Sequence, residues 1–204
     1  DAGVQMHIHT NGDEAIEVAL DALEMAKIQK NRPDLIHVLQ HCQMADRAQF
    51  RKMKRLGVAA NLFANHLYYF GDKHYELTMG PDRALRMDAC QSAIDYGVTF
   101  TIHSDAPVTP MAPLFTAWCA VNRLTESGRT LGEYEKITVA EALEAITLGA
   151  AATLHMDHEI GSIEVGKWAD FAILEDDPET IGAEKLKDVG IWGTVLAGEK
   201  HKIP

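Results

Sequence analysis

The sequence has few cysteines, no long apolar run and no excess of basic residues, and each shortage excludes a class of protein. The three cysteines, Cys42, Cys90 and Cys119, form no CxxC motif and no disulfide framework, so we expect a reducing, cytoplasmic location. No apolar run approaches the roughly 20 residues that cross a bilayer, which argues against a membrane protein. The formal net charge of −11 argues against nucleic-acid binding, because phosphate contacts need clustered lysine and arginine.

The overall composition is that of an ordinary globular protein, with 47% hydrophobic and 24% charged residues. A length of 204 residues allows one sizeable core, or one domain with part of another. The sequence starts at Asp1 and enters a predicted strand almost at once. We therefore expect it to be part of a longer protein.

The first two thirds of the chain alternate between strand and helix patterns. Strands are predicted at residues 4–8, 35–39, 58–63 and 98–102. Helices are predicted at residues 16–26, 45–56 and 84–96, and a long loop at residues 64–82. Four such units predict a parallel sheet with right-handed crossovers. A closed (β/α)8 barrel needs about 250 residues, so the pattern leaves open half a barrel or an open α/β sheet.

Beyond residue 107 the pattern changes. A short apolar helix is predicted at residues 113–122, and Thr138 with Glu141 forms a capping box ahead of a helix over 139–148. Short strands with turns follow, at residues 161–163, 169–174 and 193–197. We therefore divide the chain into an α/β part, residues 1–150, and part of a small β domain, residues 151–204.

Three side chains that can bind a metal lie at or just beyond the carboxyl ends of predicted strands, namely His9, His41 and Asp105. Barrels and open α/β sheets have their active sites at this edge. Two imidazoles and one carboxylate suit Zn²⁺ or a similar divalent ion. A single histidine at a strand end is more often a structural residue, but three such residues in equivalent positions favour a metal site.

Four segments resemble landmarks of the amidohydrolase superfamily. They are His41-Cys42-Gln43, the HSDAPV segment at residues 103–108, the GSIEVGKWAD segment at residues 161–170 and the HTNGDEA segment at residues 9–15. The last is similar to the His-x-x-Gly-Asp-x-Ala segment of the amidohydrolase-3 branch, which includes N-substituted formamide deformylase-like proteins. The segments occur in the expected order and span nearly the whole chain.

This resemblance implies the C-terminal half of a (β/α)8 TIM barrel, strands five to eight, followed by the C-terminal strands of a small β-sandwich. It implies that His9 and His41 bind metal from the fifth and sixth strands. Asp105, from the eighth, would bind metal and act as the catalytic base. One or two divalent ions are implied, with zinc as the expected ion. Such an ion lowers the pKa of bound water, and a carboxylate accepts its proton.

The superfamily's first strand carries a His-x-His pair, which this chain lacks at the expected place. His7-Ile8-His9 has that form, but only four strand units separate it from Asp105. We therefore expect His7 to lie in the barrel interior without binding metal, and the first four strands to lie upstream of the sequence.

Three further residues are candidates for substrate binding: His66, Arg83 and His103. His66 lies in the predicted loop, and long loops often cover or bind a substrate, although plain packing is the alternative. Strand alternation could place His103 on the same face as Asp105. Arg83, like Arg123, resembles a basic position of the branch, and a surface or helix-end salt bridge is the preferred alternative for both.

The predicted function is a metal-dependent hydrolase that cleaves the C–N bond of a small amide, formamide or similar non-peptide substrate. The activity would belong to the longer protein. The alternatives are a non-catalytic structural or regulatory relative, and an inactive fragment whose open sheet edges pair with another copy. In that last case the chain would form a homo-oligomer.

Overall fold

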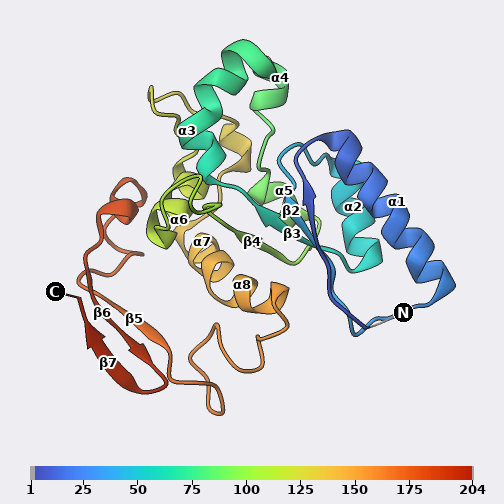
Figure 1. Cartoon of the computed structure of the whole chain (residues 1–204). Coiled ribbons are helices and arrows are strands. Elements are labelled where there is room, and N and C mark those ends of the chain that lie inside the picture. The colour runs from blue at the N-terminus through green and yellow to red at the C-terminus, as the bar shows by residue number, and fades with distance from the viewer. Residues whose placement is uncertain (1–2, 204) are drawn as a thin grey trace.

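The computed structural model describes residues 3–203, which form two separate sheets with helices around the larger one (Figure 1). The larger sheet has the strand order β1 (His7–Thr10), β2 (Val38–His41), β3 (Ala59–Leu62) and β4 (Phe100–Ile102). Its strand pairings are all parallel. Spatial order follows chain order, so each connection is a crossover. The predicted α/β class with a parallel sheet is confirmed.

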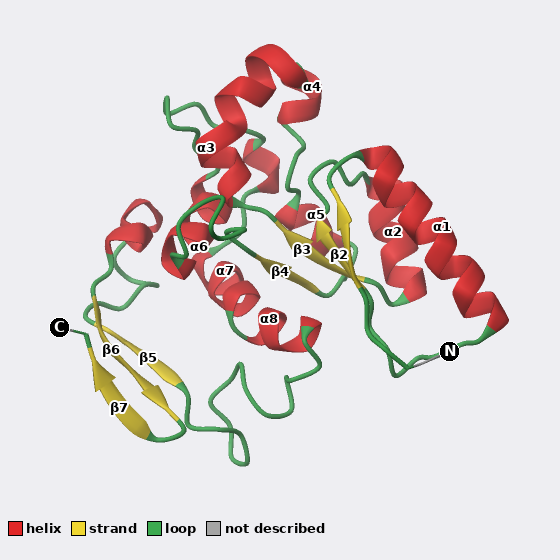
Figure 2. Ribbon diagram, in the orientation of Figure 1, coloured by secondary structure: helices red, strands yellow, loops and turns green. Residues whose placement is uncertain are grey.

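The first two crossovers contain the helices α1 (Asp13–Gln29) and α2 (Arg47–Leu56), which pack side by side next to the sheet (Figure 2). The side chain of Asp46 caps α2 by accepting the main-chain N–H of Gln49. Gly57 ends this helix in the left-handed conformation, with φ 65°, where a residue with a Cβ is strained. Local capping signals therefore set both ends of α2.

The segment predicted as a long loop is helical, which corrects that prediction. It contains α3 (Asn65–Lys73), one π-helical turn (His74–Thr78) and α4 (Pro81–Ala84). A Cβ on Gly71 would lie 2.7 Å from Cδ1 of Leu131, so this glycine allows α3 to pack closely against its neighbours. Packing of this kind overrides local propensity and is not visible in the sequence pattern.

The helix predicted over residues 84–96 is interrupted, and only α5 (Cys90–Asp95) is regular. Asp88 has a left-handed backbone, with φ 48°. The Arg123 guanidinium donates hydrogen bonds to the main-chain oxygens of Met87 and Asp88, at 2.7 and 2.8 Å. A continuous helix would use these oxygens as acceptors for N–H groups four residues further on. The arginine therefore takes the place of the helical bonds, and the helix starts later than predicted.

Helices α7 (Val139–Ile146) and α8 (Leu148–Thr153) pack against β4, and α6 (Pro113–Asn122) packs against α7. The predicted capping box is confirmed, with reciprocal bonds between Thr138 and Glu141. Short 3-10 turns lie at Glu133–Glu135 and Ala183–Asp188. Within residues 3–203, none of the helices has the length and apolar character that crossing a membrane requires.

The smaller sheet is antiparallel, with the order β5 (Phe171–Leu174), β6 (Ile191–Leu196) and β7 (Glu199–Lys202). It lies away from the parallel sheet and close to the C-terminus (Figure 1). The strands predicted at residues 169–174 and 193–197 correspond to β5 and β6. β7 was not predicted, because its short charged sequence lacks an apolar alternation.

One predicted strand is absent, and another begins later than predicted, for the same reason. Residues 161–163 are all described and form no strand, and Ile163 is 83% exposed. The first strand begins at His7 and not at residue 4, and Val4 and Met6 are 66% and 43% exposed. Apolar alternation predicts a strand only where a second layer covers the apolar face, and these residues have no such layer.

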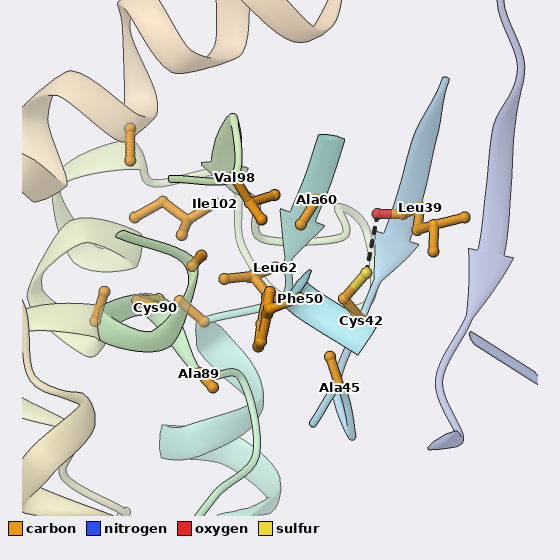
Figure 3. Packing of buried hydrophobic residues seen from close by; sticks show 14 of the residues in the cluster. Leu39, Cys42, Ala45, Phe50, Ala60, Leu62, Ala89, Cys90, Val98 and Ile102 are labelled. Carbon is orange, nitrogen blue, oxygen red and sulfur yellow. Dashed lines mark hydrogen bonds between the residues drawn. The ribbon is translucent and has the colours of Figure 1, made fainter. Parts of the chain in front are cut away.

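The main hydrophobic core lies between the parallel sheet and its helices (Figure 3). Leu39 and Ala60 of neighbouring strands and Phe50 of α2 are fully buried in it. All three cysteines are buried free thiols in the described part of the chain. Burial raises the pKa of the Cys42 and Cys90 thiols to about 12, so neither is a reactive thiolate near neutral pH.

We expect Phe50→Ala to lower the free energy of unfolding by about 3–5 kcal/mol, because it removes a fully buried ring from the core. The measurement is urea unfolding followed by circular dichroism. Leu77→Ala is the control, since Leu77 is 80% exposed, and its effect should stay within about 0.5 kcal/mol. Equal losses from the two substitutions would contradict the location of the core.

Candidate active site

The carboxyl ends of β1 and β2 bring two histidine rings together. The ring centroids of His9 and His41 are 4.5 Å apart in an edge-to-face arrangement. Thr10 pairs with His41 in the strand ladder, so the two rings come from neighbouring strands. Parallel pairing is the physical reason, because it places the carboxyl ends of successive strands at one edge of the sheet.

Two more histidines surround His41. The ring of His103, which follows β4, lies 5.0 Å from the His41 ring, and the His66 ring on α3 lies 6.2 Å from it. Phe63 packs against both, with its ring centroid 5.0 Å from His103 and 4.0 Å from His66. The candidate site is therefore a cluster of imidazoles with an aromatic wall.

The backbone is strained where these side chains leave the strands. His41 has φ 70°, Cys42 has φ 47° and Asp105 has φ 53°, in the left-handed region that residues with a Cβ seldom adopt. Such a conformation costs on the order of 1–3 kcal/mol for each residue and persists only where the surroundings enforce it. The sheet and its helices therefore fix the direction in which His41 and Asp105 leave their strands.

Burial keeps the central imidazoles uncharged. It lowers the pKa of His41, an effect that the Asp105 carboxylate opposes and the neighbouring His9 reinforces. Burial, with a smaller contribution from His41, lowers the pKa of His103 to about 4. Both rings are therefore neutral near pH 7, which is the form of histidine that binds a metal ion.

Several buried polar atoms of this cluster have no hydrogen-bond partner within residues 3–203. They are Nδ1 of His41, Nδ1 of His66, Nε2 of His103 and both carboxylate oxygens of Asp88. Buried polar groups are nearly always paired, so each of these atoms needs an explanation. For the His9–His41 pair, a neutral ring with an unpaired nitrogen at a strand end fits a divalent metal ion.

Asp105, the third predicted ligand, lies at the same edge. Its main-chain N–H donates to Nδ1 of His103 at 3.1 Å, and its carboxylate opposes the lowering of the pKa of His41 and His103. In the part of the chain that the structure describes, no group of three or more histidine, cysteine, aspartate or glutamate side chains is arranged to hold a metal ion. The structure brings His9 and His41 together, and the complete set with Asp105 stays a prediction.

Arg83 and His7 lie outside the cluster. Nη2 of Arg83 lies 3.1 Å from Oδ2 of Asp13 and lowers the pKa of that carboxyl, so Arg83 forms the salt bridge expected as its alternative role. Nδ1 of His7 bonds with Nε2 of Gln40 at 2.7 Å, and Oε1 of Gln40 accepts from Nδ2 of Asn61 at 2.7 Å. This row of polar contacts joins β1, β2 and β3.

Two buried charged residues beside the cluster are absent from the predicted site, Asp88 and Arg123. Asp88 is 0% exposed, and its Oδ2 lies 3.7 Å from Nδ1 of His66. Arg123 is also 0% exposed, so the surface or helix-end salt bridge expected for it is wrong. The only signal in the sequence was the resemblance of Arg123 to a basic position of the branch. Asp88 gave none, because a charged residue within a helix pattern indicates a solvent-facing side.

A parallel sheet with histidines and an aspartate at its carboxyl edge defines an α/β protein of the class that has its active site at this edge. The model of the amidohydrolase family matches residues 1–200. The chain therefore belongs to the amidohydrolase family, and the resemblance predicted from its motifs is confirmed.

Known proteins resemble the chain over nearly its whole length. It is 32% identical over 198 residues to an N-substituted formamide deformylase from Arthrobacter pascens, across 96% of this chain and 36% of that protein. It is 26% identical over 179 residues to an imidazolonepropionase from Alkaliphilus metalliredigens, across 85% of this chain and 34% of that protein. An uncharacterized metal-dependent hydrolase from Pyrococcus horikoshii OT3 shares the fold, with a TM-score of 0.75 and 23% identity over 89% of this chain and 36% of that one. The chain thus spans about a third of the length of the relatives it matches.

The histidine cluster predicts a loss of stability in weak acid. The folded-state pKa of His103, about 4, lies below the unfolded value of about 6.5, so between these values the unfolded chain binds more protons. The free energy of unfolding should therefore fall as the pH drops from about 6.5 towards 4, by at most about 3 kcal/mol from this group. The lowered pKa of His41 acts in the same direction.

The measurement is urea unfolding at a series of pH values with a chelator present. His103→Gln should reduce the pH dependence relative to the unsubstituted protein, whereas His201→Gln, at an exposed position, should not. Contributions from carboxyl groups are common to all three proteins and cancel in the comparison. Identical pH profiles for the unsubstituted protein and His103→Gln would show that His103 does not cause the loss of stability in weak acid.

Proposed function

We propose that a protein containing this chain is a metal-dependent hydrolase that cleaves the C–N bond of a small amide or formamide through metal-activated water. The observation that carries the proposal is the His9–His41 pair, 4.5 Å apart at the carboxyl edge of a parallel sheet, in a chain of the amidohydrolase family. The activity is proposed for a protein of the relatives' length, because this chain spans about a third of them.

A formamide is the first candidate substrate, because the N-substituted formamide deformylase is named for one and is 32% identical to this chain. The imidazolonepropionase is named for a different substrate and is 26% identical. We therefore rank N-substituted formamides and related linear amides ahead of cyclic substrates.

The side chains at the strand ends suit this chemistry. His9, His41 and Asp105 would hold one or two zinc ions, which supply a bound water with its pKa lowered to about 7. The Asp105 carboxylate would accept the proton of the attacking water and return it to the nitrogen of the leaving amine. Its influence on the pKa of both His41 and His103 supports this position. His66 and His103 would contact the substrate.

We further propose that β1 to β4 are the fifth to eighth strands of a (β/α)8 barrel. They run in chain order with helices between them, as consecutive barrel strands do. The sheet of β5, β6 and β7 would belong to a small β-sandwich. Trp168, just before β5, is 60% exposed and Leu196 is 61% exposed, and large apolar side chains of this kind indicate a face that another layer covers.

The histidine pair predicts zinc binding that depends on both rings. We expect His9→Ala and His41→Ala each to weaken Zn²⁺ binding by more than about tenfold, since loss of a residue that merely supports a ligand costs about 10–100-fold. Isothermal titration calorimetry measures the affinity. His158→Ala is the control, because His158 is exposed and paired with Glu159. Unchanged affinity in both site variants would remove the pair as metal ligands.

In a protein of the relatives' length, Asp105→Asn should retain the fold and lose roughly 10²–10⁴-fold in kcat, the usual contribution of a general acid–base residue. The assay is release of the amine from an N-substituted formamide. Asp82→Asn, at an exposed position on α4, is the matched control. An unimpaired Asp105→Asn enzyme would exclude Asp105 as the base. A parent protein inactive on both amides and formamides would favour the non-catalytic alternative.

A further inference from the structure

We propose that Asp88 is a positioning residue that holds His66 with its proton on Nδ1, which leaves Nε2 of His66 as a hydrogen-bond acceptor on the side of the ring away from Asp88. The position of the proton is inferred from the pairing of His66 with Asp88 and does not depend on the proposed function. The role of the acceptor, which is to bind an N–H of the amide or formamide substrate, rests on the proposed function.

The Asp88 carboxylate is a buried group that needs a donor. Asp88 is 0% exposed, and neither carboxylate oxygen has a hydrogen-bond partner among residues 3–203. A buried carboxylate without a partner is strongly disfavoured. Nδ1 of His66 is also buried and unpaired, and it lies 3.7 Å from Oδ2 of Asp88. The two groups satisfy each other once they come into contact.

Main-chain contacts fix the place of Asp88. Its N–H donates to the main-chain oxygen of Gln43 at 2.9 Å, and its main-chain oxygen accepts from Nη1 of Arg123 at 2.8 Å. Its φ of 48° is a conformation that persists only where the surroundings enforce it, and such residues cluster at functional sites. The segment after β2 and the end of α6 therefore hold the carboxylate beside His66.

Arg123 supplies the opposite charge. It is 0% exposed, and within the described chain its guanidinium donates to the main-chain oxygens of Leu131, Met87 and Asp88. Burial lowers the pKa of Arg123, and nearby acidic groups that include the Asp88 carboxylate oppose this change. A buried charge persists when an opposite charge compensates it, and we take Asp88 as the carboxylate that faces this buried cation. A carboxylate only accepts hydrogen bonds.

The ring of His66 is also held in place. It is 9% exposed, and its centroid lies 4.0 Å from the Phe63 ring and 5.6 Å from the Phe70 ring. A distance of 3.7 Å to the carboxylate leaves no room for a bridging water, which needs a hydrogen bond on each side. A small rotation of the two side chains closes this distance to a charge-assisted bond of about 2.8 Å.

The carboxylate decides which ring nitrogen carries the proton. A neutral imidazole has one N–H and one acceptor nitrogen, so pairing with Asp88 places the proton on Nδ1 and leaves a lone pair on Nε2. The His74 ring lies 5.9 Å from His66, and its Nδ1 bonds with Oγ1 of Thr78 at 2.8 Å.

An acceptor at Nε2 has a consequence for the substrate. The His66 ring lies 6.2 Å from the His41 ring, so an amide bound at the strand-end pair is within reach of it. An acceptor pairs with an amide N–H and has no partner in an amide whose nitrogen carries two substituents. The site should therefore prefer N-monosubstituted formamides or amides over N,N-disubstituted ones.

The test reads the ring protonation of His66 by nitrogen-15 NMR. The spectrum is recorded at about pH 8.5, roughly two units above the usual histidine pKa, with a chelator and without substrate, and the His66 signals are identified by their loss in His66→Gln. We expect the Nδ1–H form to be the major form in the unsubstituted protein. A major Nε2–H form, or an even mixture, would overturn the proposal whether or not any Asp88 variant folds.

Asp88→Asn is the matched variant, because it keeps the shape of the side chain and adds a donor. In the Ser-His-Asp triad of serine proteases, replacing the aspartate by asparagine produces the wrong histidine tautomer. We therefore expect the NMR shifts of Nδ1 and Nε2 of His66 to exchange. Asp82→Asn, at an exposed position, should leave them unchanged. A folded Asp88→Asn protein that keeps the Nδ1–H form would show that Asp88 does not position the ring.

These measurements contain no metal and no substrate, so they are independent of the proposed hydrolysis. An Nδ1–H ring in a protein without hydrolase activity would overturn the function and leave the Asp88–His66 pairing intact. In an active protein of the relatives' length, N-monosubstituted formamides should react faster than N,N-disubstituted ones, and Asp88→Asn should lose this preference. Equal rates in the unsubstituted enzyme would overturn the acceptor role of Nε2.

Discussion

The candidate site and the packing around it follow from the parallel pairing of β1 to β4 in chain order. This pairing brings the carboxyl ends of all four strands to one edge, and with them His9, His41 and Asp105, which lie far apart in the sequence. The strands contain only three or four residues each. The backbone at the end of each strand therefore has a large effect on the direction of the side chains there. The left-handed backbone at His41 and Asp105 shows that packing on both sides overcomes local strain at this edge.

Burial governs the chemistry of the same edge. It lowers the pKa of His41 and His103 and raises the pKa of Cys42, which directly follows His41. Near neutral pH the imidazoles are therefore unprotonated at one nitrogen and able to bind a metal, while the Cys42 thiol keeps its proton and does not compete for it. A more open sheet edge would favour protonated imidazoles and a more reactive thiol, so the aromatic and helical cover is part of the site.

The buried charges of Arg123 and Asp88 connect this edge to the helices around it. Arg123 bonds to three main-chain oxygens and thereby joins the end of α6 to the segment before α5 and to Leu131. Removing such charges from water costs several kcal/mol for each ion, so we do not expect these two residues to contribute mainly to the free energy of unfolding. Their effect is geometric, because they interrupt one helix and hold a carboxylate 3.7 Å from His66.

Periodicity and capping act within a few residues, so they are enough to predict the parallel α/β order, the helix at Pro113–Asn122 and the cap at Thr138. The sequence also indicated His9 and His41 as neighbours, since strand ends meet at one edge of a parallel sheet. The helical form of residues 64–82 and the roles of Arg123 and Asp88 became clear from the folded chain. These depend on contacts between distant segments, such as the bond between Arg123 and Asp88, 35 residues apart. The sequence pattern of a charged residue does not indicate whether it is hydrated at the surface or bonded to a buried carbonyl oxygen.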